Sequence, residues 1–140
     1  MPVLGINVLK VEYEKKGAVI GRVEVSLNPK IEDMRLGEMI FPNGKVNGIE
    51  VALNYEVQYS PNIATGRVKL MVFYLPRDRD KVDEILDMWE SEKKIPPELF
   101  TEVVNFTTVE LMPLLIAIAK EMKIPYPIPV PRIAVRKEEG

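Results

Sequence analysis

Hydrophobic and polar residues alternate along the first half of the chain with the period of a β-strand. The most regular run extends over residues 49–59, where Ile49, Val51, Leu53, Tyr55 and Val57 alternate with polar or small residues. Similar runs cover residues 9–14 and 19–28. Because successive side chains of a strand point to opposite faces, this alternation predicts strands with one buried and one solvated face.

A fourth run, residues 67–75, is hydrophobic on both faces. One face carries Val68, Leu70, Val72 and Tyr74, and the other carries Met71, Phe73 and Leu75. A strand of this kind is covered on both sides. The cover over the second face is either an interface within an oligomer, a segment of the same chain, or a hydrophobic partner that binds in a groove.

The segment between the second and third runs, residues 28–48, is long for a hairpin connection. It contains Pro29, Pro42 and three glycines, and it also carries Met39, Ile40 and Phe41. Its hydrophobic residues argue against a simple solvated loop. We expect this segment to cross over part of the molecule.

The second half of the chain is predicted to be helical. Val82, Ile85, Leu86 and Trp89 have the spacing of one helix face, and Ile95-Pro96-Pro97 is expected to end that helix. Residues 107–110 are typical of a capping box, and Pro113 then predicts a kink or a restart. Strands followed by helices predict a single α+β domain over residues 1–140: a four-stranded antiparallel sheet within residues 3–75, with helices within 78–123 on one face.

The chain then alternates proline with large hydrophobic residues, in Ile124-Pro125-Tyr126-Pro127-Ile128-Pro129-Val130-Pro131. Proline fixes φ and donates no backbone hydrogen bond. This tail is therefore expected to be extended, and it needs a surface to lie against.

Composition excludes several classes of function. Nineteen basic and 21 acidic residues give a net charge of −2 with both signs interspersed, which argues against a nucleic-acid-binding surface. The sequence has no cysteine and no histidine, so it lacks a thiolate nucleophile, the commonest general base and the commonest metal ligand. The acidic residues of 78–87 alternate with basic ones, as on a solvated helix face. We expect no enzyme activity, no metal and no cofactor.

The N-terminal sequence Met1-Pro2-Val3-Leu4-Gly5 has no basic region followed by a hydrophobic run, and no segment reaches ~18 continuous hydrophobic residues. We therefore expect a cytoplasmic protein without a membrane span. Abundant Lys and Glu with a single glutamine, Gln58, resemble the composition of heat-adapted proteins.

Residues 111–133 resemble the SecB export-chaperone family. Met112-Pro113 matches the apolar–proline step that opens the main helix of that family, and residues 125–133 are similar to its hydrophobic, proline-bearing tail. The order of four strands, a crossover and helices is similar over most of the chain. The family's glycine-rich aromatic stretch after the fourth strand is absent, and its acidic C-terminal tail is reduced to Glu138-Glu139.

This resemblance implies a homo-oligomer, typically a dimer of dimers, and an ATP-independent holdase that binds unfolded polypeptide in hydrophobic grooves. The function expected from the sequence is such a chaperone, with a link to protein export. The alternative is a non-catalytic interaction subunit of the same fold, whose hydrophobic faces serve assembly. We expect six residues to line the client groove, namely Phe41, Met71, Phe73, Leu75, Tyr126 and Ile128.

Overall fold

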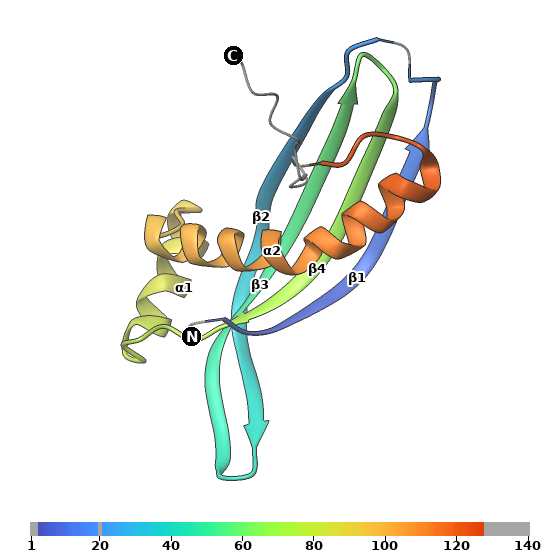
Figure 1. Ribbon diagram of the computed structural model, residues 1–140. Coiled ribbons are helices and arrows are strands. Elements are labelled where there is room, and N and C mark those ends of the chain that lie inside the picture. Colours follow the sequence, from blue (N-terminus) through green and yellow to red (C-terminus); the bar gives the residue numbers. More distant parts are fainter. Residues whose placement is uncertain (1–2, 20, 128–140) are drawn as a thin grey trace, which may run out of the picture.

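The computed structural model describes residues 3–19 and 21–127 of the chain (Figure 1). Four strands are followed by two helices: β1 (Val3–Lys15), β2 (Glu24–Phe41), β3 (Gly44–Ser60), β4 (Ala64–Tyr74), α1 (Lys81–Glu92) and α2 (Pro97–Met122). The strands form one antiparallel sheet in the order β1-β4-β3-β2. The predicted α+β fold class is confirmed.

The core lies between one face of the sheet and α2, as the alternation along β3 and β4 predicts. Val51, Leu53, Val68 and Leu70 are buried in one cluster with a stripe of α2 that includes Leu115. Full burial of each such side chain contributes about 1.5–3 kcal/mol. The two helices lie on the same side of the sheet (Figure 1), so no helix within the described residues covers the other face.

Buried hydroxyl groups connect this core to α2. The Tyr55 hydroxyl of β3 lies 3.2 Å from the carbonyl oxygen of Val104 and 2.9 Å from Oγ1 of Thr108, and it also contacts Oγ1 of Thr107. Thr107 in turn donates to the carbonyl oxygen of Val103 at 2.9 Å. Burial raises the pKa of Tyr55, and the two threonine hydroxyls oppose that shift. These contacts fix the position of α2 along β3.

The expected crossover between the second and third strands is wrong. β2 and β3 are paired along their whole length, from Glu24 opposite Ser60 to Phe41 opposite Gly44. The strands therefore form one long hairpin, whose outer part (residues 36–49, here called the arm) extends beyond the rest of the molecule (Figure 1). The hydrophobic residues of this segment belong to strands, and Pro29 is tolerated because β2 lies at an edge of the sheet.

Of the predicted kink or restart at Pro113, the restart is wrong, because α2 continues without interruption from Pro97 to Met122. Proline removes the hydrogen bond to the carbonyl group four residues earlier, which here belongs to Val109. The Val109 side chain is 72% exposed, so this stretch of the helix faces solvent and water can hydrate the carbonyl. Thr107 lies inside the helix and does not cap a new one.

The α2 helix ends at Lys123, which has left-handed backbone angles, and the chain then leaves the helix. Lys15 at the end of β1 donates from Nζ to the carbonyl oxygen of Met122 at 2.8 Å. Ile124 is buried with Val57 and Tyr59 on the helix side of the sheet. Residues 124–127 are not helical, which agrees with the predicted extended tail. The tail from Ile128 onward lies outside the described residues.

Candidate protein-binding surface

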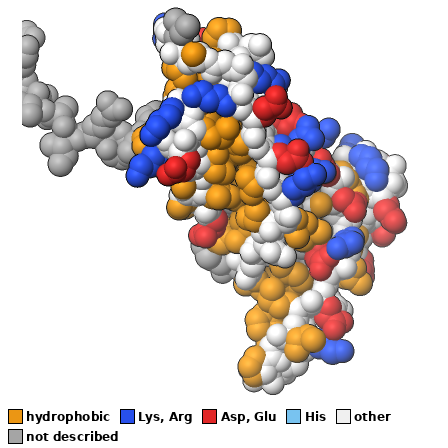
Figure 2. Space-filling view, turned by 90° about the vertical axis from the view of Figure 1, so that its right-hand side faces the viewer, with side chains coloured by type: hydrophobic (Ala, Val, Ile, Leu, Met, Phe, Trp, Pro, Cys, Tyr) orange, Lys and Arg blue, Asp and Glu red, His pale blue; other side chains and the backbone are white. Residues whose placement is uncertain are grey.

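The free side of β1 carries the clearest hydrophobic surface. Within the described sheet, β1 is paired with β4 on one side only. Four of its side chains are 39% to 59% exposed: Leu4, Val8, Leu9 and Val11. Figure 2 looks onto this side of the molecule and shows hydrophobic side chains gathered in a band. We call this free side of β1, with these four side chains, the β1 edge.

Two irregularities in β1 bring leucines to this surface. The register with β4 shifts between Val3 and Gly5 and again between Val8 and Lys10. Leu4 and Leu9 are the extra residues at these positions, and such β-bulges remove a residue from regular pairing. Val8 and Val11 instead lie opposite Leu70 and Val68 and face the helix side. The edge thus combines a regular apolar row with two protruding leucines.

Charges on the other face of β1 neutralise one another within the strand. Nζ of Lys10 lies 2.6 Å from Oε1 of Glu12. The hydrogen bond and the charge of Lys10 lower the pKa of Glu12 below its usual value. Both side chains are exposed, so the pair adds little to stability. Its effect is to leave the β1 edge without a strong charge of either sign.

Two of the residues predicted to line a client groove are placed on the helix-free face at the base of the arm. Phe73 is only 8% exposed. Its ring lies over Gly48, where an added Cβ atom would be 2.6 Å from the Phe73 Cζ atom. Met71 is half-buried on the same strand face, and Leu75, just beyond β4, is half-buried as well. Phe73 is therefore packed into the base of the arm, with little of its ring open to a partner.

The other predicted residues lie elsewhere. Phe41 is at the end of β2, next to the turn of the arm, and is partly exposed together with Leu36 and Ile40. Tyr126 is partly exposed and follows Ile124, which packs on the helix side at the opposite end of the sheet. Ile128 lies outside the described residues. The structure thus brings Met71 and Phe73 together but places Phe41 and Tyr126 at separate ends of the molecule.

Sequence reasoning did not single out the β1 edge. Leu9, Val11 and Tyr13 were interpreted as the buried face of an ordinary strand, and only Tyr13 packs against the core. Strand order decides which strand is an edge, and a single sequence carries no direct signal of strand order. The sequence offers an edge signal for the other strand only: Pro29 lies in the run that became β2, and proline within a strand is largely confined to sheet edges.

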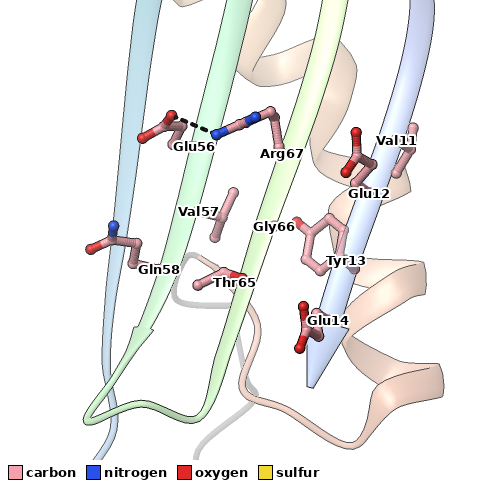
Figure 3. Close-up of a pocket in the computed structure, with 10 residues that line it drawn as sticks. All are labelled: Val11, Glu12, Tyr13, Glu14, Glu56, Val57, Gln58, Thr65, Gly66 and Arg67. Carbon is pink, nitrogen blue, oxygen red and sulfur yellow. Dashed lines mark hydrogen bonds and ion pairs between the residues drawn. The ribbon is translucent and has the colours of Figure 1, made fainter. Parts of the chain in front are cut away.

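A polar hollow of ≈ 600 Å³ lies over β1, β4 and β3 (Figure 3). Its charged lining includes Glu56 and Arg67, whose Oε1 and Nη2 atoms are 3.3 Å apart, and the paired Glu12. Among residues 3–19 and 21–127, no group of three side chains could hold a metal ion.

The outward side of α2 carries few charged residues and one strongly exposed hydrophobic side chain, Val109. Between Val103 and Ala119 the sequence has one charged residue, Glu110. Val109 and Phe100 are exposed on this helix. By length and composition α2 could cross a membrane, with a mean hydropathy of 1.5 over 18 residues, of which 33% are buried. A helix that packs against its own sheet, as α2 does here, passes the same test of length and composition.

Comparisons with known proteins give limited information. No protein family model matches the chain, and no curated protein matches it. One similar solved structure is the Mycobacterium tuberculosis Rv1957 SecB-like chaperone in complex with a ChAD peptide from the Rv1956 HigA1 antitoxin, at 9% sequence identity and a TM-score of 0.44. The match covers 96% of this chain and 91% of that chain. Similarity at this level does not establish family membership, and the functional proposal is carried by the surface of the chain itself.

Proposed function

We propose that this protein is an ATP-independent chaperone that holds unfolded polypeptide on exposed hydrophobic surface. The observation that carries the proposal is the β1 edge, where exposed side chains such as Leu9 and Val11 lie beside an unpaired strand. Unfolded chains expose both hydrophobic side chains and unpaired backbone groups, and this surface can bind both. Burial of hydrophobic area favours binding by about 25 cal/mol per Å², less the cost of ordering the client.

The proposed activity requires no catalysis and no cofactor. The sequence has no cysteine or histidine, and the charged side chains of the polar hollow include the ion pair of Glu56 and Arg67. The protein is proposed to act in the cytoplasm, on clients that include proteins destined for export. Phe41 at the arm and Tyr126 are proposed to extend the client surface, since both are partly exposed.

The chain is further proposed to form a homo-oligomer, at least a dimer, through the outward side of α2. Exposed hydrophobic surface is typical of an interface, and α2 presents Val109 on a stretch, residues 103–119, that has one charged residue. Light scattering at micromolar concentration is expected to show a dimer or larger, and Val109→Lys to shift it towards the monomer. A wild-type monomer at that concentration would contradict this part of the proposal.

A second candidate function is a non-catalytic assembly subunit whose hydrophobic surfaces bind only fixed partners. The burial of Phe73 favours it. This residue was predicted to line the groove, but packing within the chain already covers its ring. This candidate predicts stable assembly without affinity for unrelated unfolded proteins.

A heat-aggregation assay separates the two candidates. A chaperone suppresses aggregation of an unrelated thermolabile client at near-equimolar ratio without nucleotide, and binds a hydrophobic dye while folded. Leu9→Lys is expected to weaken the suppression several-fold without lowering the melting temperature, because Leu9 is exposed. Full-length protein that leaves the aggregation of several clients unchanged would overturn the chaperone proposal in favour of the assembly subunit.

A further inference from the structure

We infer that the β1 edge binds its client as an added antiparallel strand, and that it selects segments in which hydrophobic and polar residues alternate. This inference rests on the proposed chaperone function and names the mode of binding and the class of segment. It concerns backbone pairing on the free side of β1, in addition to hydrophobic contact.

The backbone of β1 is suited to accept another strand. Its free side presents N–H and C=O groups that have no partner strand within residues 3–19 and 21–127, and none of the residues from Val3 to Lys15 is a proline. From Lys10 to Lys15 the strand is regular, with each residue opposite one residue of β4. A strand that is regular on its paired side also presents evenly placed groups on its free side. This stretch can therefore pair with about six client residues.

The two faces of the edge differ, and this difference sets the preferred client sequence. On the helix side the edge presents Val8 and Val11, which extend the apolar row of Leu70 and Val68. On the other face it presents Lys10 and Glu12, which are paired with each other. Side chains of an added strand lie beside those of β1 on the same face. The client strand should therefore be hydrophobic at every second position and tolerant of either charge at the positions between.

A foreign segment suits this edge better than a second copy of β1. Two copies paired about Tyr13 place Glu12 opposite Glu14 and Lys10 opposite Lys16, each twice. Pairing about Glu12 places this carboxylate opposite itself and Lys10 opposite Glu14 twice, so it combines repulsion at the centre with attraction on both sides. Like charges directly opposite each other destabilise strand pairs. If the two copies pair about Val11, Lys10 lies opposite Glu12 and the repulsion is avoided. The bulge at Leu9 then interrupts the pairing just beyond these residues on each side of Val11. A client segment has neither restriction and can use the whole regular stretch.

Two peptides with identical side chains test the mode of binding. The probe alternates valine with threonine over about ten residues, with lysines at both ends for solubility. In one version the backbone nitrogens of the valines are methylated, and in the other those of the threonines. Valine and threonine N–H groups point to opposite edges of the strand, and the side chains prevent the peptide from turning over.

Strand addition predicts that one methylated peptide binds the full-length protein with the affinity of the parent peptide. The other should bind about 10- to 100-fold more weakly, because its methyl groups remove several hydrogen bonds and add steric bulk at the pairing edge. Equal affinity of the two methylated peptides would overturn the inference, because it shows docking by side chains alone. If client aggregation is still suppressed in that case, the proposed chaperone function stands without strand addition. Failure of both peptide binding and suppression would overturn both.

Two leucine variants locate the site. Leu9 and Leu36 are both strand residues with similar exposure, 59% and 57%. Leu9→Lys on the β1 edge should weaken binding of the unmethylated peptide about 10-fold, and Leu36→Lys on the arm should leave it unchanged. The reverse result would contradict the assignment to β1. Dissociation of an oligomer by Leu9→Lys, with peptide affinity unchanged, would assign the edge to a second copy and also overturn the inference.

Discussion

The two edges of the sheet, β1 and β2, are protected to different degrees. β2 carries Pro29, which cannot donate a hydrogen bond, and its exposed residues from Glu24 to Glu32 are polar. A bulge between Ile31 and Asp33 further interrupts its regular pairing. β1 has bulges too, but it has no proline, and its exposed residues include four hydrophobic ones. The exposed hydrophobic residues of β2 are Leu36, Ile40 and Phe41, which all lie in the arm.

This difference shows how one sheet can present a closed edge and an open edge. Proline, charges and bulges at an edge are the usual means by which proteins prevent unwanted strand addition. Over residues 24–33, β2 uses all three, which protects this part of the edge from pairing with other chains. On β1 the bulges expose leucines instead of hiding the strand, and the paired Lys10 and Glu12 do not repel an incoming strand of either charge. An open edge of this kind is a liability unless a partner uses it.

The largest expected effect comes from the attachment of β1 to the sheet. The Tyr13 ring extends from β1 across Gly66 of β4 (Figure 3), and an added Cβ atom on Gly66 would lie 2.4 Å from the Tyr13 Cζ atom. Gly66→Ala must displace the ring or the strand. Overpacking of this kind costs about 1–3 kcal/mol, and we expect a loss in the upper half of that range in urea unfolding.

The matched control is Gly37→Ala in the arm. Its added Cβ atom would meet the side chain of Glu50, 2.5 Å from Cγ. That side chain can move away at the cost of its exposed ion pair with Arg35, which is worth at most about 1 kcal/mol. Equal losses from the two substitutions would show that Tyr13 has no special part in holding β1.

The second prediction concerns the edge of the sheet formed by β2. Pro29→Val restores a backbone donor in β2, and we expect it to create a second site for the alternating valine–threonine peptide. The measured stoichiometry should rise from one peptide per chain towards two. The wild-type protein and an exposed polar-site variant, Asn28→Val, serve as controls, because neither adds a backbone donor. Stoichiometry that stays at one would show that charge and the bulge are sufficient to close β2.

Much of this comparison could not be predicted from the sequence. The alternation in β3 and β4 and the helical spacing of α1 follow from burial, so the fold class was predictable. The order of strands depends on which strands meet in three dimensions, and no local pattern encodes it. For the same reason Phe73 was expected in an open groove, whereas the glycine at position 48 lets its ring pack flat against the sheet.

A smaller effect is expected at alkaline pH, and it acts on the β1 side. Burial, together with the carboxylates of Glu102 and Glu98, raises the pKa of Tyr74 to about 12. Burial and the neighbouring Tyr59 also raise the pKa of Tyr13. Phenols titrate near pH 10 in the unfolded chain. Because the folded state holds these protons more tightly, their stabilisation is complete below about pH 10 and is lost as the pH rises towards 12.

The Tyr13 hydroxyl is buried and has no hydrogen-bond partner among the described residues. Tyr13→Phe should therefore change stability little at pH 7 and reduce the loss between pH 9 and 11, as followed by urea midpoints. An unchanged alkaline slope would show that Tyr13 does not contribute to it.

The smallest expected effect is at the end of β1, where Lys15 donates to the carbonyl oxygen of Met122 at 2.8 Å. A cation at the C-terminal end of a helix interacts favourably with the helix dipole, typically by 0.3–1 kcal/mol at an exposed site. Lys15→Met keeps most of the side-chain volume and removes the charge, so thermal unfolding should show a loss of about 0.5 kcal/mol at low salt. Because salt screens exposed charges, the loss should shrink in 1 M NaCl. Lys16→Met, one residue beyond the strand, is the control, and an equal effect from both would mean that net charge, and not this contact, accounts for the loss.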